Sequence, residues 1–210
     1  VEPTTPVETE KPVEDVINTV VKDMVSVTAL TDSKYDYEIT VSNTLTTGKL
    51  SNGKAITDSN ITAMLNEIKA IFPNETSWGD SKNGVAYHYV ASNPSPSGSG
   101  CNAWTGMVGD ILFGKGAKWT ANDDLYDAKP GDLIEWIGSN GVSRHWIVVM
   151  SAEAITNSQL NFETNEVTEY ETVRITYCDG NRGYKVSWLG KTTIDVMLDT
   201  YPNSVLYSAY

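Results

Sequence analysis

The 210-residue sequence is poor in cysteine, histidine and positive charge. It contains two cysteines and two histidines, and 27 Asp and Glu residues outnumber 15 Lys and Arg residues. Two cysteines are too few for a disulfide scaffold, although they suffice for one bridge. The net charge of −12 creates a surface field that repels nucleic acid and anionic lipid. No apolar run approaches the roughly 20 residues of a membrane-spanning helix, so we expect neither nucleic acid as a partner nor a span of the membrane.

The chain divides into a short tail, an extension and one main domain. Residues 1–14 carry Pro, Thr, Glu and Val without a hydrophobic period, so this segment cannot bury enough apolar surface to offset the entropy of ordering it. It is typical of a stalk that remains after a secretion signal has been removed, which predicts a secreted or cell-surface protein. The 40% hydrophobic content supports one sizeable core. We assign residues 15–57 to an N-terminal extension or small subdomain and residues 58–210 to the main domain.

The first half of the chain contains one clear helix. Helix and strand interpretations compete over residues 16–30, whereas polar and apolar residues alternate over residues 35–41, as in a half-buried strand. The segment 57–73, TDSNITAMLNEIKAIFP, has apolar residues at helical spacing. Asp58 or Thr57 can cap its start and Pro73 prevents its continuation. The segment therefore predicts an amphipathic helix.

The second half predicts a helix followed by strands. After the loop SNPSPSGSG, apolar residues recur at spacings of three and four from Trp104 to Leu112, and Gly114 can end the helix. Five segments with strand character follow, separated by Gly, Asn and Ser. They are DLIEWI, HWIVVM, a stretch near 161–162, TVRITYC and KVSWL. A helix followed by an antiparallel sheet indicates an α+β fold.

Cys101 stands at the start of the second predicted helix, where unpaired backbone N–H groups lower a thiol pKa and favour the nucleophilic thiolate. Such a nucleophile needs a basic partner, and His145 opens the apolar strand that we expect to pack against this helix. Asp179 or Asn181 can orient the imidazole, because the two share a face if their strand continues. Cys178 then points to the opposite face. The alternatives for Cys101 are an inert core thiol or a disulfide with Cys178.

Four motifs in this order resemble the NlpC/P60 and CHAP group of papain-like cysteine peptidases and amidases, especially secreted members from Gram-positive bacteria. They are GCNAWTGMVGDILFG, AKPGDLIEW, RHWIVVMS and YCDGNRGYKVSWLG, and the likeness covers roughly residues 60–195. In that group, a helix carrying the cysteine packs on an antiparallel sheet carrying the histidine. The resemblance implies that Cys101 is the nucleophile and His145 the general base. Asp179 stands where many CHAP-like members have Glu, and Asn181 where they have Asn.

The resemblance further implies a secreted bacterial hydrolase that cleaves amide bonds of cell-wall peptides (peptidoglycan) through a thioester, as an endopeptidase or an amidase. No cofactor or metal is required for this chemistry, and we expect a monomer. Trp78 and Tyr87, near the loop that precedes the cysteine, are expected to line the substrate groove. A non-catalytic surface binding module on the same fold is the alternative function. A transferase that uses the same thioester is a third possibility.

Overall fold

Two sheets of different size organise the protein. The structure, a computed structural model, describes residues 21–43, 48–79, 85–92, 94–95 and 98–210. The larger sheet has six antiparallel strands in the order β4-β9-β5-β6-β7-β8, and the smaller sheet has the order β1-β2-β3. The strand bounds are β1 Val25–Ala29, β2 Tyr37–Val41, β3 Tyr87–Tyr89, β4 Thr120–Asn122, β5 Leu133–Ile137, β6 Ser143–Leu160, β7 Val167–Asp179, β8 Ser187–Thr193 and β9 Val205–Ser208.

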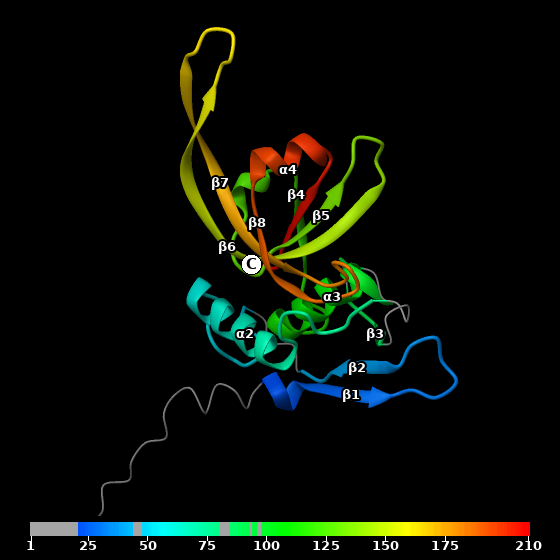
Figure 1. Cartoon of the computed structure of the whole chain (residues 1–210). Coiled ribbons are helices and arrows are strands. Elements are labelled where there is room, and N and C mark those ends of the chain that lie inside the picture. Colours follow the sequence, from blue (N-terminus) through cyan, green and yellow to red (C-terminus); the bar gives the residue numbers. More distant parts are fainter. Residues whose placement is uncertain (1–20, 44–47, 80–84, 93, 96–97) are drawn as a thin grey trace, which may run out of the picture.

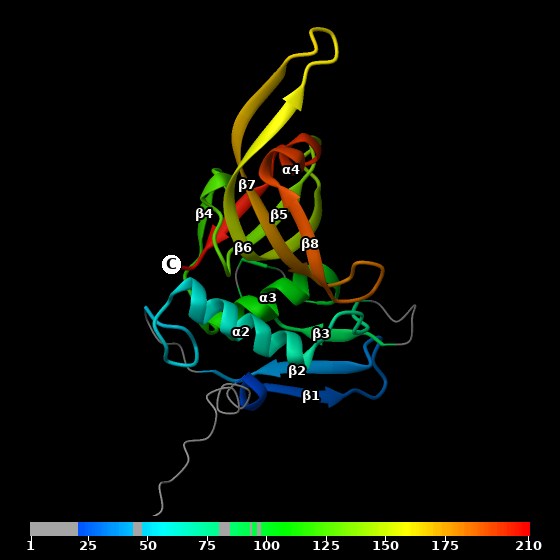
Figure 2. The ribbon, with the colours of Figure 1, turned by 60° about the vertical axis from the view of Figure 1, so that its left-hand side comes forward.

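The two long helices lie between the sheets. Figures 1 and 2 show α2 (Asp58–Ile71) and α3 (Gly100–Phe113) beneath the large sheet, with β1, β2 and β3 on their other side. One core of buried side chains joins these three layers, from Ile39 and Val41 of the small sheet to Trp146 and Val148 of the large one. The described elements therefore form the α+β arrangement that the sequence predicts.

Local sequence signals fix the ends of both helices. The Thr57 hydroxyl accepts a hydrogen bond from the Asn60 backbone N–H and caps the start of α2. Gly114 ends α3 with φ of 87°, a left-handed conformation that glycine adopts without strain. Between these ends, α3 is buried almost throughout, as expected for a helix enclosed between two sheets.

A second core lies on the opposite face of the large sheet. There α4 (Ile194–Thr200) and the 3₁₀ turn Leu125–Asp127 cover the sheet, and their apolar side chains pack against alternate residues of its strands. In β6, Trp146 and Val148 belong to the first core, while Ile147 and Val149 belong to the second. This burial on both faces explains why the segment is continuously apolar.

The N-terminal extension is built into the main domain. Within residues 16–30, residues 21–24 are helical and Val25–Ala29 form β1, so each competing interpretation holds for part of the described segment. Strand β2 pairs in parallel with β3, which lies in the segment assigned to the main domain. The predicted stalk, residues 1–14, lies outside the described residues.

The predicted strand near residues 161–162 is wrong. Cross-strand pairing of β6 and β7 ends at Leu160 and Val167, and residues 161–164 form the turn between them. The Asn161 side chain accepts hydrogen bonds from the Glu163 and Thr164 backbone N–H groups, which is typical of Asn in turns. The short strands β3, β4 and β9 and helix α4 were not predicted, because they contain too few residues to show a period.

Candidate active site

Cys101 lies in the first turn of α3 and is half-buried. The residue before the helix, Ser99, makes no side-chain cap, and the first turn contains no acidic residue. Ser99 therefore caps none of the backbone N–H groups at this end, but the Ala103 N–H donates to Asn102 Oδ1 at 3.0 Å. The Asn102 N–H donates to the Cys101 sulfur, so this end of the helix stabilises negative charge on the thiolate.

His145 and Asp179 form a hydrogen-bonded pair on the neighbouring strands β6 and β7. The His145 Nε2 atom lies 3.0 Å from Asp179 Oδ2. Asp179 is the last residue of β7 and its side chain is only 2% exposed. A buried carboxylate that accepts a hydrogen bond from the Nε2–H group fixes the orientation and tautomer of the ring. The other ring nitrogen, Nδ1, is then free to face a nucleophile.

The thiol and the imidazole interact directly. Burial raises the pKa of Cys101, but the hydrogen bond and positive charge of His145, with contributions from the backbone N–H groups of Trp146 and Asn102, outweigh it and lower the pKa. Burial lowers the pKa of His145, but hydrogen bonds to Asp179 and Cys101 raise it to about 9. Both shifts therefore favour a thiolate beside an imidazolium, which is the reactive form of a cysteine nucleophile.

The Asn181 amide lies beside Gly100, the residue that precedes Cys101 in the chain. Strand β7 ends at Asp179, and Asn181 has φ of 73°, so its side chain does not continue the alternation of the strand. A Cβ atom placed on Gly100 would lie 3.2 Å from Asn181 Nδ2, and one on Gly79 would lie 2.2 Å from Oδ1. The amide is thus held between Gly79 and the start of α3. Of the two predicted orienting residues, Asp179 contacts His145.

Both cysteines are free, and they lie in different environments. Cys178 is fully buried in the first core, next to the Trp104 indole, and burial raises the pKa of its thiol. As the sequence predicts, Cys101 and Cys178 form no disulfide with each other. Gly180 is required here, because an added Cβ would lie 2.4 Å from the Trp104 Cβ atom.

The structure places Trp78 in the core, which corrects the expectation that it lines the groove. Its side chain is 0% exposed, so it has no surface to offer a substrate. Its indole N–H donates to the Gly100 carbonyl at 2.8 Å, and its ring stacks on Tyr87 with a centroid distance of 5.2 Å. Trp78 therefore supports the first turn of α3 from beneath. Tyr87 is half-buried and also stacks on Tyr37.

The sequence analysis did not identify an aromatic cluster around Trp136, which lies next to the His145 ring. Trp136 of β5 is paired directly with His145 of β6, and the ring centroids are 5.4 Å apart. Its indole also stacks on Tyr201 at 5.1 Å and meets Tyr177 edge to face. Pairing of DLIEWI with HWIVVM in the correct register would have revealed this neighbour.

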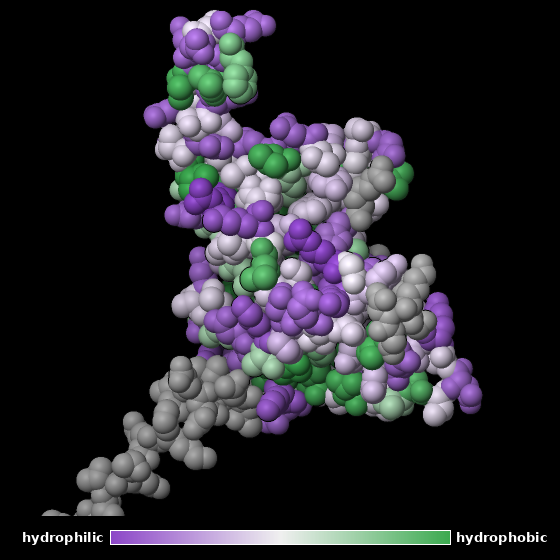
Figure 3. All heavy atoms as spheres, in the orientation of Figure 1, coloured by the Kyte–Doolittle hydropathy of each residue, from purple (hydrophilic) through white to green (hydrophobic). Residues whose placement is uncertain are grey.

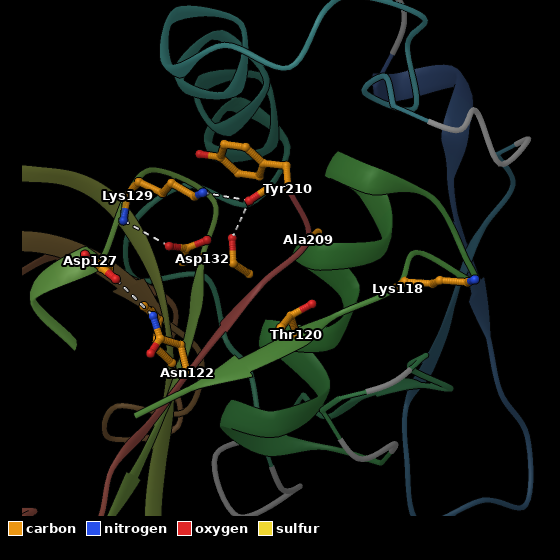
Figure 4. Close-up of a pocket in the computed structure, with 10 residues that line it drawn as sticks. Lys118, Thr120, Asn122, Asp127, Lys129, Asp132, Ala209 and Tyr210 are labelled. Carbon is orange, nitrogen blue, oxygen red and sulfur yellow. Dashed lines mark hydrogen bonds between the residues drawn. The ribbon is translucent and has the colours of Figure 1, made fainter. Parts of the chain in front are cut away.

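A hollow of about 540 Å³ lies at the end of α3 that is far from Cys101 (Figure 4). Tyr210 forms part of its wall and stacks on Phe113, the last residue of α3. Lys129 donates to the Tyr210 carbonyl at 2.6 Å and lies over the Tyr210 ring. Lys129 and Tyr210 thus partner each other, and the lining contains neither cysteine nor histidine.

The described residues contain no cluster of His, Cys, Asp and Glu suited to a metal ion. In the same part of the chain, no helix is both long and apolar enough to cross a membrane. Comparison with known protein families, with curated proteins and with solved structures found no match for this chain.

Proposed function

We propose that the protein is a cysteine hydrolase that cleaves amide bonds through a thioester, with a papain-like arrangement related to the NlpC/P60 and CHAP group. One observation carries the proposal. Cys101, His145 and Asp179, from α3, β6 and β7, form a continuous chain of hydrogen bonds in which the pKa of the thiol is lowered. A nucleophile, a base and an orienting carboxylate in this order constitute the machinery of acyl transfer.

In the first half-reaction, the Cys101 thiolate attacks the carbonyl carbon of the amide and the C=O electron pair moves onto oxygen. The resulting oxyanion lies at the N-terminus of α3, where the Cys101 backbone N–H can donate to it. The Asn181 amide lies beside Gly100 and can supply the second donor. As the C–N bond breaks, the His145 imidazolium transfers its proton to the leaving amine, and an acyl-thioester remains.

In the second half-reaction, the now neutral His145 removes a proton from water, which attacks the thioester carbonyl. This proton transfer regenerates the imidazolium, and collapse of the tetrahedral intermediate then breaks the C–S bond, expels the Cys101 thiolate and releases the carboxylic acid product, which loses its proton to water. Asp179 stays buried throughout, and its hydrogen bond to the ring orients and stabilises the imidazolium. Every proton and electron pair is accounted for by the three side chains, the substrate and water, so the cycle needs no cofactor.

The proposed substrates are peptide or amide bonds in bacterial cell-wall peptidoglycan, cleaved by a secreted or cell-surface protein. This part rests on the four motifs around Cys101, Pro130–Asp132, His145 and Asp179, which resemble those of cell-wall hydrolases. Residues 130–132 form the turn that leads into β5, in which Gly131 has φ of 88° and the buried Asp132 carboxylate accepts from the Lys129 backbone N–H.

Alkylation tests the nucleophile with an internal control. We expect iodoacetamide at pH 7 to modify Cys101 at least about tenfold faster than a free cysteine whose pKa is near 8.5, because the lowered pKa of Cys101 increases its thiolate fraction. Cys178, fully buried in the same molecule, should stay unmodified in peptide mass spectra. Equal rates for Cys101 and free cysteine would remove the basis for a thiolate–imidazolium pair.

Hydrolysis tests the reaction itself. Purified peptidoglycan should release new amino groups or soluble fragments with the parent protein and not with Cys101→Ala, while Cys178→Ala retains activity if it folds. A Cys101→Ala variant that clears peptidoglycan as fast as the parent contradicts the enzyme proposal and favours a binding module. Rapid alkylation without release from peptidoglycan would contradict only the substrate.

A further inference from the structure

The hairpin formed by β6 and β7 extends far beyond the sheet that contains it. Strand β6 contacts β5 no further than Val149, and β7 pairs with β8 only from Arg174 onward. Residues 155–171, here called the hairpin arm, are therefore a two-stranded ribbon without a neighbouring strand on either edge. Figures 1 and 2 show it projecting from the body. None of its residues is buried, and such a ribbon gains little stability on its own.

The arm has one sign of charge. It contains four glutamates, Glu163, Glu166, Glu169 and Glu171, and no Lys or Arg. Glu169 and Glu171 project from the same face of β7 as Val167, because alternate residues of a strand share a face. Their partners across the hairpin, Ser158 and Thr156, are uncharged. The negative charge along the strands is thus concentrated on β7, next to its free edge.

The end of the arm has exposed apolar side chains and a hollow. The Phe162 side chain is 87% exposed, and Leu160 and Val167, paired across the hairpin, are also exposed. Figure 3 shows hydrophobic side chains among hydrophilic ones near this end. A hollow of about 540 Å³ is lined there by Gln159, Leu160, Asn161, Phe162, Glu163 and Thr168. Leu160 and Phe162 beside the Glu163 carboxylate suit a lysine side chain, which buries its aliphatic stem and keeps its ammonium group near water.

We propose that the hairpin arm is a docking element for a basic, extended segment of another protein, which adds as a strand to the free edge of β7. Edge addition supplies main-chain hydrogen bonds. Basic side chains at alternate positions would lie beside Glu169 and Glu171, and opposite charges on adjacent strands stabilise pairing. The β6 edge offers no such charge. A second copy is a poor occupant, because two β7 edges would bring glutamates together.

A peptide probe tests this inference independently of the thiol chemistry. The probe is the acetylated and amidated peptide Thr-Lys-Val-Lys-Val-Lys-Val-Lys-Thr, and its matched control carries Glu in place of Lys. Hydrogen exchange measured by mass spectrometry on the full chain should slow in residues 167–171 with the Lys peptide only. Replacing the central Val by Pro should abolish the effect, since proline cannot donate to a ladder.

Variants of the arm separate edge pairing from general attraction to an acidic protein. The double variant Glu169→Gln and Glu171→Gln should weaken peptide binding about fivefold at low salt. The matched double variant Asp23→Asn and Asp123→Asn, which removes two exposed charges elsewhere, should not weaken it by more than about 1.5-fold. Equal weakening by both doubles, protection outside the arm, or no binding at about 1 mM peptide would overturn the inference. A dimer in sedimentation that Glu169→Lys disrupts would assign the edge to a second copy instead.

Discussion

The charge of Asp179 sets the pH range in which the proposed enzyme works. The Asp179→Asn substitution removes this charge and keeps an oxygen that can still accept the 3.0 Å hydrogen bond from His145 Nε2–H. The pKa of His145 is raised from 6.5 to about 9 by hydrogen bonds to Asp179 and Cys101, against the effect of burial. Loss of the carboxylate charge should lower the pKa of His145 by about one to two units, since one neighbouring charge shifts a pKa by roughly 1–3 units.

The sign of the pH effect follows from the protonation state that the reaction needs. Hydrolysis requires thiolate and imidazolium together, so the rate of the parent should fall as pH rises through about 9, where His145 loses its proton. In Asp179→Asn this alkaline fall should begin about one to two pH units lower. The maximal rate should drop roughly 10- to 100-fold, as expected for loss of one charge-assisted hydrogen bond.

The assay is the pH profile of amide hydrolysis together with the pH profile of Cys101 alkylation. Asp195→Asn is the matched control, because that carboxylate accepts from the Tyr126 hydroxyl in a different part of the fold, and its profile should coincide with that of the parent. Circular dichroism and thermal unfolding show whether each variant is folded. An alkaline fall that stays near pH 9 in a folded Asp179→Asn variant would refute the assigned role of the carboxylate.

Three further substitutions probe neighbouring features. Asn181→Gly, which removes the amide and suits the positive φ, should reduce hydrolysis about 100-fold while Cys101 alkylation and its pH profile stay unchanged, because an oxyanion donor acts only in the acyl-transfer step. Gly180→Ala should lower the free energy of unfolding by at least about 2 kcal/mol in urea titrations, since its Cβ would overlap Trp104. Thr57→Ala should cost about 1 kcal/mol of stability through loss of the α2 cap, with hydrolysis unaffected.

The sequence predicts features that depend on local pattern. The helices at 58–71 and 100–113 follow from apolar spacing and end signals, and Thr57 and Gly114 act as predicted. The continuous apolar run HWIVVM predicts a buried strand, and the structure confirms it. Cys101 lies near the start of α3 and His145 near the start of β6, and the packing of α3 on the large sheet brings them together. Position within an element can be read from the sequence, so these two residues were identifiable.

Asn181 and Trp78 show where this reasoning fails. Placing Asn181 on the face of Asp179 assumed that the strand continues, but β7 ends at Asp179 and the next turn uses a positive φ at Asn181. Trp78 has no periodic neighbours, so its burial depends on the packing of Tyr87 and Trp104 around it. Strand ends and aromatic packing are tertiary properties that one sequence does not encode locally.

The hairpin arm was not predicted from the sequence, although the pattern of residues changes within this pair of strands. Residues 145–150 are apolar at almost every position and lie in a strand covered on both faces. From residue 155 to 171 polar residues occupy both faces, and this ribbon is exposed on both. Such a pattern predicts a strand without a covering layer, but it says nothing about the neighbours along its edges. Whether these edges are free depends on where β5 and β8 end, which the sequence of the hairpin itself does not show.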